Sequence, residues 1–296
     1  MAPTTSSQTR RARPDALIKL LRSGRTHHGY TYTEGLNICT QPWNDEECGS
    51  GGLYACELRH IFVWITLYPD ITEVAWVDVP ADAQVAQFDT KIKASALVLT
   101  GSMPIEEAVA LAIQAGADVH FNDDQALRFV SAYGHLSVVE FLVKAGANVH
   151  AKDDEALRLA SERGHLAVVQ FLVASGANVH ANNDQALRFA SESGNLPVVQ
   201  VLVTAGADVH AVDDYALRRA SSSDNLSVVE VLVKAGADVH AKNDYALRYA
   251  SMYGNLPVVK VLVKAGADVH AADDDALRSA SASGHLPVVE FLKTLP

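Results

Sequence analysis

The sequence predicts an α-solenoid, a stack of antiparallel helix pairs, capped by a small α+β domain. Three observations support this prediction. Residues 121–296 repeat with a period of 30, and each copy carries two apolar helix-like segments, separated by glycine in five of the six copies. Residues 14–102 contain no repeat and instead show apolar alternation typical of strands. Because one helix pair cannot bury both of its faces, neighbouring units must stack to form a continuous core.

The repeat is regular along the whole second part of the chain. Residues 103–120 match the back half of a unit, and Ala-Leu-Arg recurs in every complete copy. Copies start at Phe121, Ala151, Ala181, Ala211, Ala241 and Ala271, and the last has 26 residues, to Pro296. The expected domains are therefore a basic tail over 1–13, an α+β cap over 14–102 and a repeat domain over 103–296.

Each unit divides into two predicted helices. Asp154 precedes the first helix, Glu155–Ser161, and its carboxylate is expected to cap the free N–H groups of the first turn. Gly164 occupies the stop position, where a left-handed conformation is favoured. The more apolar run Leu166–Val173 predicts the second helix, which Gly176 ends.

These units resemble the ankyrin repeat. The core at Gly134–Val149, with its Gly-His-Leu, Val-Val and Gly-Ala-Asn-Val elements, is similar to that family almost letter for letter. The family's unit is about 33 residues long. The shortening falls where the family carries Asp-Gly-x-Thr-Pro-Leu-His, which here reads Asp-Glu-Ala-Leu-Arg at Asp154–Arg158. The resemblance implies a protein-binding scaffold without catalysis, with blunted fingers that have little β character.

The expected elements of the first part are one helix and five strands. Ala16–Leu21 predicts the helix, and Gly49–Gly52 predicts a flexible turn. The strands are expected at Thr31–Leu36, Ile61–Leu67, Val74–Val79, Gln84–Phe88 and Lys91–Leu99. This domain should cover the apolar helix around Ala108–Ile113.

The first part also resembles the N-terminal module that precedes ankyrin repeats in many proteins of giant amoeba viruses. The resembling pieces are His28–Tyr30, Gly35–Asn37, Pro42–Trp43, Gly51–Tyr54, Val79–Pro80 with Asp82–Ala83, and Lys91–Ala94. The repeats resemble those of the same proteins, including the shortened finger. The resemblance implies a viral source and a host protein as the partner, and assigns no chemistry to the module.

Composition narrows the functional class. The formal net charge is −11, which argues against broad nucleic-acid binding. No run of 18 apolar residues is present, and the N-terminus lacks the apolar segment of a signal peptide. Three cysteines do not make a disulfide framework. We expect a monomeric cytoplasmic protein, in the host cell if viral, that binds neither nucleic acid nor membrane.

Two repeated features have both a structural and a functional interpretation. The histidines His120, His150, His180, His210, His240 and His270 could form a metal ladder. Units that stack about 8–10 Å apart cannot share zinc ligands, so we favour hydrogen bonds to the adjacent loop. Each acid of the Asp154 type could pair with the arginine four residues later, as Asp154 with Arg158, in a structural row that could also contact a partner.

The first part offers two alternative sites, neither of which the spacing favours. Cys39, Cys48, Cys56 and His60 could hold zinc but lack a closely spaced cysteine pair. The segments His28–Gly29, Gly35–Leu36 and Gly52–Ala55 faintly resemble the His…Tyr…Glu cleft of ADP-ribosyltransferases. The gap after the histidine is short, and only Asp82 and Asp89 stand near the place of the glutamate. We expect no catalytic residue, no cofactor and no metal; the alternative is a transferase that selects substrates through its repeats.

Partner choice must come from positions that differ between copies. Three such positions lie on the first helix of each unit, which lines the concave face in the ankyrin family. Tyrosine and arginine there are typical interface hot spots, although some of these aromatic rings could merely pack between helices. The candidate partner-binding residues are Phe129, Tyr133, Arg163, Tyr215, Arg219, Tyr245, Tyr249 and Tyr253.

Overall fold

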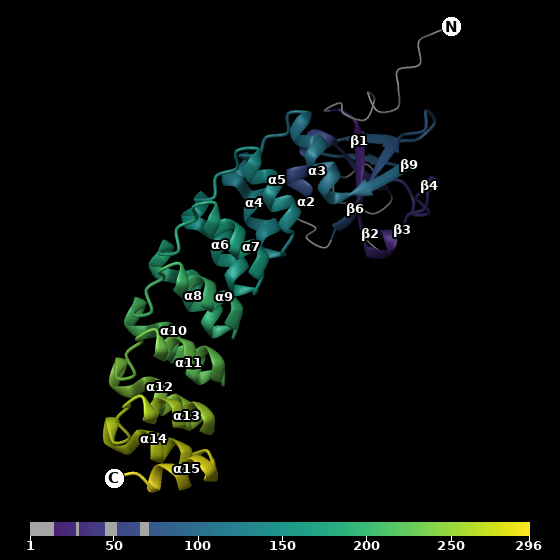
Figure 1. Ribbon diagram of the computed structural model, residues 1–296. Coiled ribbons are helices and arrows are strands. Elements are labelled where there is room, and N and C mark those ends of the chain that lie inside the picture. Colours follow the sequence, from purple (N-terminus) through teal and green to yellow (C-terminus); the bar gives the residue numbers. More distant parts are fainter. Residues whose placement is uncertain (1–14, 28–29, 45–51, 66–70) are drawn as a thin grey trace. The chain divides into compact units, whose positions relative to one another are not determined.

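A computed structural model describes residues 15–27, 30–44, 52–65 and 71–296 of the chain. The chain forms two compact units, residues 1–148 and 149–296. The first unit contains the sheet domain, the half repeat and the first complete repeat, and the second contains the remaining five repeats. Figure 1 shows both units, coloured along the sequence.

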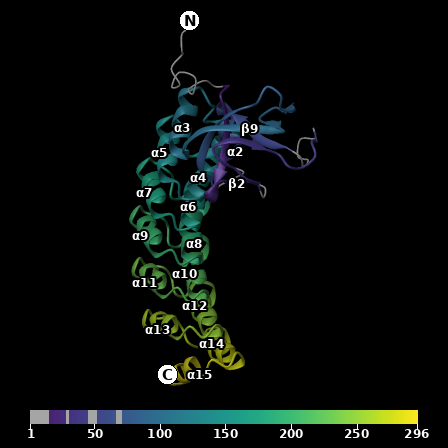
Figure 2. The ribbon, with the colours of Figure 1, turned by 90° about the vertical axis from the view of Figure 1, so that its right-hand side faces the viewer.

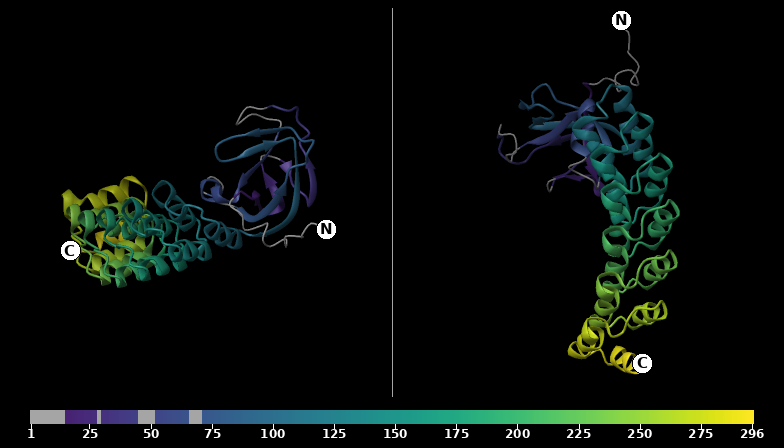
Figure 3. Two further views of the ribbon diagram at one scale, coloured as in Figure 1. Left: turned by 90° about the horizontal axis from the view of Figure 1, so that it is seen from above. Right: turned by 90° about the vertical axis from the view of Figure 1, so that its left-hand side faces the viewer.

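The first unit is built around an antiparallel seven-stranded sheet. Its strand order is β4-β9-β6-β1-β5-β8-β7, and β2 and β3 form a separate short hairpin. The strands are β1 (Leu17–Arg22), β2 (Thr26–His27), β3 (Tyr30–Thr31), β4 (Gly35–Ile38), β5 (Leu53–Glu57), β6 (Ile71–Asp78), β7 (Val85–Gln87), β8 (Ile92–Ala94) and β9 (Ala96–Pro104). The sheet curves strongly in the left view of Figure 3. Leu21, Tyr32, Ala75 and Leu97 belong to a common core cluster.

Two predictions for this domain were wrong. The expected helix at Ala16–Leu21 is strand β1, which pairs with β5 on one side and β6 on the other. The expected strand at Ile61–Leu67 begins as helix α2 (Ile61–Ile65), and its last two residues lie outside the described residues. A short apolar run can form either a helix or a strand, and packing against segments distant in sequence determines which of the two forms. Ile18 is fully buried in β1, whereas Ile61, Phe62 and Ile65 share the buried side of α2.

The other predicted strands are present with changed limits. The expected Thr31–Leu36 strand is divided between β3 and β4, because Asn37 holds the intervening turn. Its side-chain oxygen accepts from the Thr33 N–H at 2.9 Å, and its amide donates to the Thr33 carbonyl at 2.8 Å. The expected Lys91–Leu99 strand is divided between β8 and β9 at Ser95. The predicted turn at Gly49–Gly52 lies, except for its last residue, outside the described residues.

The sheet domain and the first repeat meet through helix α3 (Ile105–Gln114). This helix contacts β6 and β9, and it also contacts α5 (Leu136–Lys144), the second helix of the first complete repeat. Ala108, Val109 and Ala112 are fully buried. The first part therefore covers the apolar helix as predicted. A short helix, η2 (Leu58–His60), also contacts α3, and another, η1 (Ser23–Arg25), lies beside β6.

Each complete repeat is a pair of helices, as predicted. The first helices are α4 (Phe121–Ala132), α6 (Ala151–Glu162), α8 (Ala181–Glu192), α10 (Ala211–Ser222), α12 (Ala241–Met252) and α14 (Ala271–Ala282). The second helices, after α5, are α7 (Leu166–Ala174), α9 (Leu196–Thr204), α11 (Leu226–Lys234), α13 (Leu256–Lys264) and α15 (Leu286–Lys293). In the second unit, first helices form one row and second helices another (Figure 2). Leu172 of α7 is fully buried, as is Leu202 at the same position in α9.

Within the bounds given, each first helix begins with a left-handed turn rather than with a capped helical turn. In the second repeat Lys152, Asp153 and Asp154 have φ angles of 52°, 55° and 54°, and the same run recurs in the other complete copies. Left-handed residues are costly outside glycine, although Asn and Asp tolerate the conformation best. The described residues 105–296 contain no strand, so the shortened fingers lack β character as predicted.

Candidate functional site

The arginine of Ala-Leu-Arg holds the left-handed turn in place. In the second repeat Arg158 Nε donates to the Asp153 carbonyl at 2.9 Å, and Nη2 donates to the Lys152 carbonyl at 2.8 Å. Arg188 and Arg218 make the same pair of bonds to their own turns. The expected pairing of this arginine with the acid four residues earlier was wrong, because the guanidinium satisfies carbonyls that the left-handed run turns towards it.

In the second unit, the acid of each turn except the last links one repeat to the next. Asp154 Oδ1 accepts the backbone N–H of Asn178 at 2.7 Å, and Asp184 Oδ1 accepts that of Asp208 at 2.7 Å. The same oxygen of Asp154 lies 3.1 Å from His150 Nδ1. The predicted cap of the helix's own first turn was therefore wrong. The Asp154 side chain is only 5% exposed, and its carboxylate accepts a hydrogen bond from the next repeat.

The repeated histidines bond to this carboxylate rather than directly to the next loop. An ionised carboxylate only accepts hydrogen bonds, so Nδ1 is the nitrogen that carries the proton. The histidine side chain is more than half exposed in each of the six copies, and in the last copy His270 Nε2 lies 3.1 Å from the Pro296 carbonyl oxygen. Among the described residues, no three His, Cys, Asp or Glu side chains are grouped to hold a metal ion. Cys48 of the considered zinc set lies outside the described residues.

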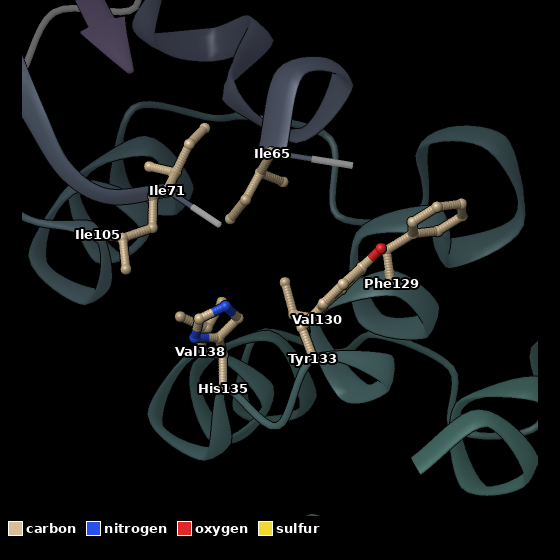
Figure 4. A pocket seen from close by; sticks show the side chains of 8 residues that line it. All are labelled: Ile65, Ile71, Ile105, Phe129, Val130, Tyr133, His135 and Val138. Atoms are coloured by element: carbon tan, nitrogen blue, oxygen red, sulfur yellow. The ribbon is translucent and has the colours of Figure 1, made fainter. Parts of the chain in front are cut away.

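Two candidate residues of the first unit lie beside an apolar pocket. Phe129 and Tyr133 of the α4 region, with Val130, line it next to Ile65 and Ile71. Ile105, His135 and Val138 complete the lining, and Figure 4 shows these side chains around a common space. The Tyr133 side chain is exposed at the end of α4, whereas Phe129 is half-buried.

Three candidate tyrosines of the second unit lie against one another. The Tyr245 and Tyr249 rings stack with centroids 3.8 Å apart, and Tyr253 follows with its centroid 6.4 Å from that of Tyr249. Residues four apart share one face of a helix. Burial, followed by the hydrogen bond with Tyr249, raises the pKa of Tyr245. Tyr253 is 52% exposed, so this aromatic row ends at solvent. Arg163, which directly follows α6 of the second repeat, is exposed.

Tyr215 and Arg219 meet a glutamate of the preceding repeat. Arg219 Nε donates to Glu192 Oε1 at 3.1 Å, and the Tyr215 hydroxyl donates to Glu192 Oε2 at 3.2 Å. The hydrogen bond from Arg219 lowers the pKa of Glu192, and the same bond raises the pKa of Arg219. These contacts hold the Tyr215 and Arg219 side chains against the preceding repeat.

Sequence reasoning missed an alternating row of arginine and tyrosine, here called the Arg–Tyr ladder: Arg188, Tyr215, Arg218, Tyr245 and Arg248. The Arg188 guanidinium lies 5.3 Å from the Tyr215 ring centroid. Arg218 lies between two rings, 5.6 Å from that of Tyr215 and 5.1 Å from that of Tyr245. Arg248 continues the row 6.0 Å from the Tyr245 centroid. The signal was present as tyrosine in two consecutive units, 27 residues after Arg188 and Arg218.

The residues of the considered transferase cleft are spread over the sheet domain. Gly35 begins β4 and Tyr54 lies in β5. Asp82 and Asp89 lie between strands, after β6 and after β7. His28 lies outside the described residues.

In the described part of the chain, no helix is both long enough and apolar enough to span a bilayer.

Comparison with known proteins places the repeats in a family. The family model for ankyrin repeats (3 copies) matches residues 127–213 and 217–294, more than half of the chain. The putative ankyrin repeat protein R868 of Acanthamoeba polyphaga mimivirus is 26% identical over 42% of this chain and 65% of its own length. The putative ankyrin repeat protein R896 of the same virus is 31% identical over 43% of this chain and 40% of its own.

A third relative carries no family name. The uncharacterized protein R869 of Acanthamoeba polyphaga mimivirus is 26% identical over 41% of this chain and 93% of its own length. The chain thus spans less than two thirds of the first two relatives. The matched family model, the 30-residue helix pairs and their stacking all agree, and the chain belongs to the ankyrin-repeat family.

Proposed function

We propose that the chain is a non-catalytic scaffold that binds a protein of an amoebal host on the face formed by its first helices. Ankyrin repeats imply protein–protein interaction, and relatives from a virus of Acanthamoeba suggest where the partner comes from. The proposed contact residues are the eight candidates, including Tyr215, Arg219, Tyr245, Tyr249 and Tyr253 in two adjacent repeats.

One observation carries the proposal. Tyr245 and Tyr249 of α12 and Tyr253, which follows that helix, form a continuous aromatic row whose last ring is 52% exposed. Rings held by stacking lose little rotamer entropy when they bind, which is why tyrosine is enriched among interface hot spots. The same position as Tyr253 is serine in three other repeats, Ser193, Ser223 and Ser283. The repeat fold therefore does not require an aromatic ring at this position.

The test is affinity capture from Acanthamoeba lysate, with proteins identified by mass spectrometry. The wild-type chain is compared with Tyr253→Ser, which installs the residue of three sister units, and with Ser193→Ala as a control at the same position of another unit. A protein enriched by wild type and by the control, and reduced with Tyr253→Ser, supports the proposal. Captured proteins that are identical for all three forms would argue that another surface selects the partner.

A further inference from the structure

The Arg–Tyr ladder differs from its surroundings in one respect, the acceptor available to the outer guanidinium nitrogen, Nη1. In the repeat before the ladder Arg158 Nη1 donates to Gln185 Oε1 of the next repeat at 2.7 Å. At its end Arg248 Nη1 donates to Asp275 Oδ2 at 3.2 Å. Gln185 and Asp275 occupy one repeat position, and Tyr215 and Tyr245 occupy that position in the two units between them.

The two tyrosines remove this acceptor and supply a ring face in its place. Arg188 and Arg218 bond their own turns through Nε and Nη2 only. Among the described residues, Nη1 of Arg188 and Nη1 of Arg218 have no hydrogen-bond acceptor. Both guanidinium groups are half-buried and held by two carbonyls each. Each therefore offers a pre-positioned cationic donor, and a carboxylate is the acceptor that such a donor binds most strongly.

The acids around the ladder already have partners. Glu192 pairs with Arg219, Asp213 with Lys242 at 2.8 Å, and Asp275 with Arg248. The local field at the two open donors is therefore less negative than the net charge of −11 suggests. An incoming carboxylate meets guanidinium nitrogen rather than an unpaired acid.

We propose that the Arg–Tyr ladder binds an extended acidic segment of the partner protein, with one carboxylate on Arg188 and a second on Arg218. Neighbouring repeats stack about 8–10 Å apart. A chain in the extended polyproline II conformation advances about 3.1 Å per residue with three residues per turn, so acidic side chains three residues apart lie on one face about 9 Å apart. This inference rests on the proposed function and names the chemistry of its partner.

The test uses fluorescence anisotropy of two labelled peptides with the full chain. One has the sequence Gly-Ser-Glu-Ala-Ala-Glu-Ala-Ser-Gly, and its twin has glutamine for both glutamates. We expect the glutamate peptide to bind and its twin to bind at least about tenfold more weakly, since each charge-assisted bond contributes about one decade. Equal binding of the two peptides, or none by the glutamate peptide at about 1 mM, overturns the proposal.

Three variants locate the binding. Tyr215→Gln with Tyr245→Gln gives both arginines the acceptor that Gln185 gives Arg158, so affinity should fall about tenfold or more. The matched Tyr215→Phe with Tyr245→Phe keeps the rings without adding an acceptor and should bind within about twofold of wild type. Gln185→Tyr frees Arg158 and should tighten binding of a peptide with a third glutamate three residues along. Unchanged affinity in the glutamine variant, or an equal loss in the phenylalanine variant, overturns the proposal.

The two proposals fail separately. If Tyr253→Ser abolishes capture of the host protein while the acidic peptide does not bind, the binding face stands and the acidic-segment inference is wrong. If the peptides and their variants behave as expected while capture is independent of Tyr253, the ladder binds carboxylates and the host partner is selected elsewhere.

Discussion

Oδ1 of Asp214 lies 2.7 Å from the backbone nitrogen of Asp238, 24 residues later in the next repeat. His210 Nδ1 lies 3.1 Å from the same oxygen. One buried carboxylate thus satisfies the loop of the following unit and fixes the imidazole of its own unit. The stack is held by this bond as well as by its apolar core.

Removing this carboxylate should cost stability only where a following repeat is present. Asp214→Ala leaves a buried N–H without its acceptor, at a cost of about 1–3 kcal/mol in the free energy of unfolding. Asp274→Ala is the matched control, because that side chain is 53% exposed in the last described repeat. Urea unfolding followed by circular dichroism measures both. Equal effects of the two substitutions would show that the inter-repeat bond contributes little.

Two glycines with similar backbone angles should differ in their tolerance of alanine. Gly194 has a φ angle of 73°, and a Cβ atom added there would lie 2.5 Å from Asn225 Oδ1. The side-chain amide of Asn225 donates a hydrogen bond to the Ser191 carbonyl at 3.3 Å. Gly206 has φ of 93° and open space around its Cβ position. Left-handed alanine costs about 1–2 kcal/mol at either site. Gly194→Ala should lower the melting temperature further because Asn225 must also move; a larger drop for Gly206→Ala would contradict this assignment.

Burial lowers the pKa of Lys19 to about 7 in the sheet domain, where its ammonium lies 4.8 Å from the Tyr32 ring centroid. Between pH 7 and the ordinary lysine pKa, the unfolded chain binds the proton that the folded one lacks. Stability should therefore rise with pH across this window, by at most about 1.4 kcal/mol per pH unit.

Tryptophan fluorescence measures this effect, because Trp43, Trp64 and Trp76 all lie in the first part of the chain. The free energy of unfolding is compared at pH 7, 8 and 9 for wild type and Lys19→Met. The difference between the two should change with pH in the stated direction. A constant difference would mean that Lys19 stays charged in the fold.

Metal removal should leave the repeats unaffected. Each repeated histidine is held by a carboxylate of its own unit, such as His180 by Asp184 at 3.0 Å, so no ion is needed to position it. The melting temperature should be the same before and after treatment with EDTA. A drop of several degrees would indicate a bound ion.

The repeats could be predicted from sequence because their signals are local. Periodicity and the glycines at Gly164 and Gly176 mark helix ends, and the structure has both glycines left-handed. The roles of Asp154 and Arg158 could not be predicted, because they depend on three consecutive left-handed residues that propensity does not indicate. In the sheet domain, a helix was predicted where β1 lies and a strand where α2 lies. The pairing of Ile18 with Cys56 and Trp76, which makes β1 a strand, joins segments that are distant in sequence.

The candidate site was predictable only as a set of variable positions. Variation between copies identified Tyr245, Tyr249 and Tyr253. In the structure the first two rings stack, and the Tyr253 ring follows at a tilt of 49° to Tyr249. A comparison of variable positions could not identify the arginines between the rings, because Ala-Leu-Arg does not vary between copies. Arg188 and Arg218 differ from their counterparts only through the residue that the next repeat places beside them.

Whether the face of the first helices binds the partner is measured by calorimetric titration of the captured host protein against two double variants of the full chain. Tyr245→Ala with Tyr253→Ala removes rings from the proposed face. Leu36→Ser with Ile38→Ser alters two exposed side chains of β4 in the sheet domain, each 56% exposed. We expect binding to weaken by more than about 1 kcal/mol per tyrosine and to be unchanged by the β4 variant, with circular dichroism unaltered in both. Full binding by the tyrosine variant and loss of binding by the β4 variant would contradict this expectation and assign recognition to the sheet domain.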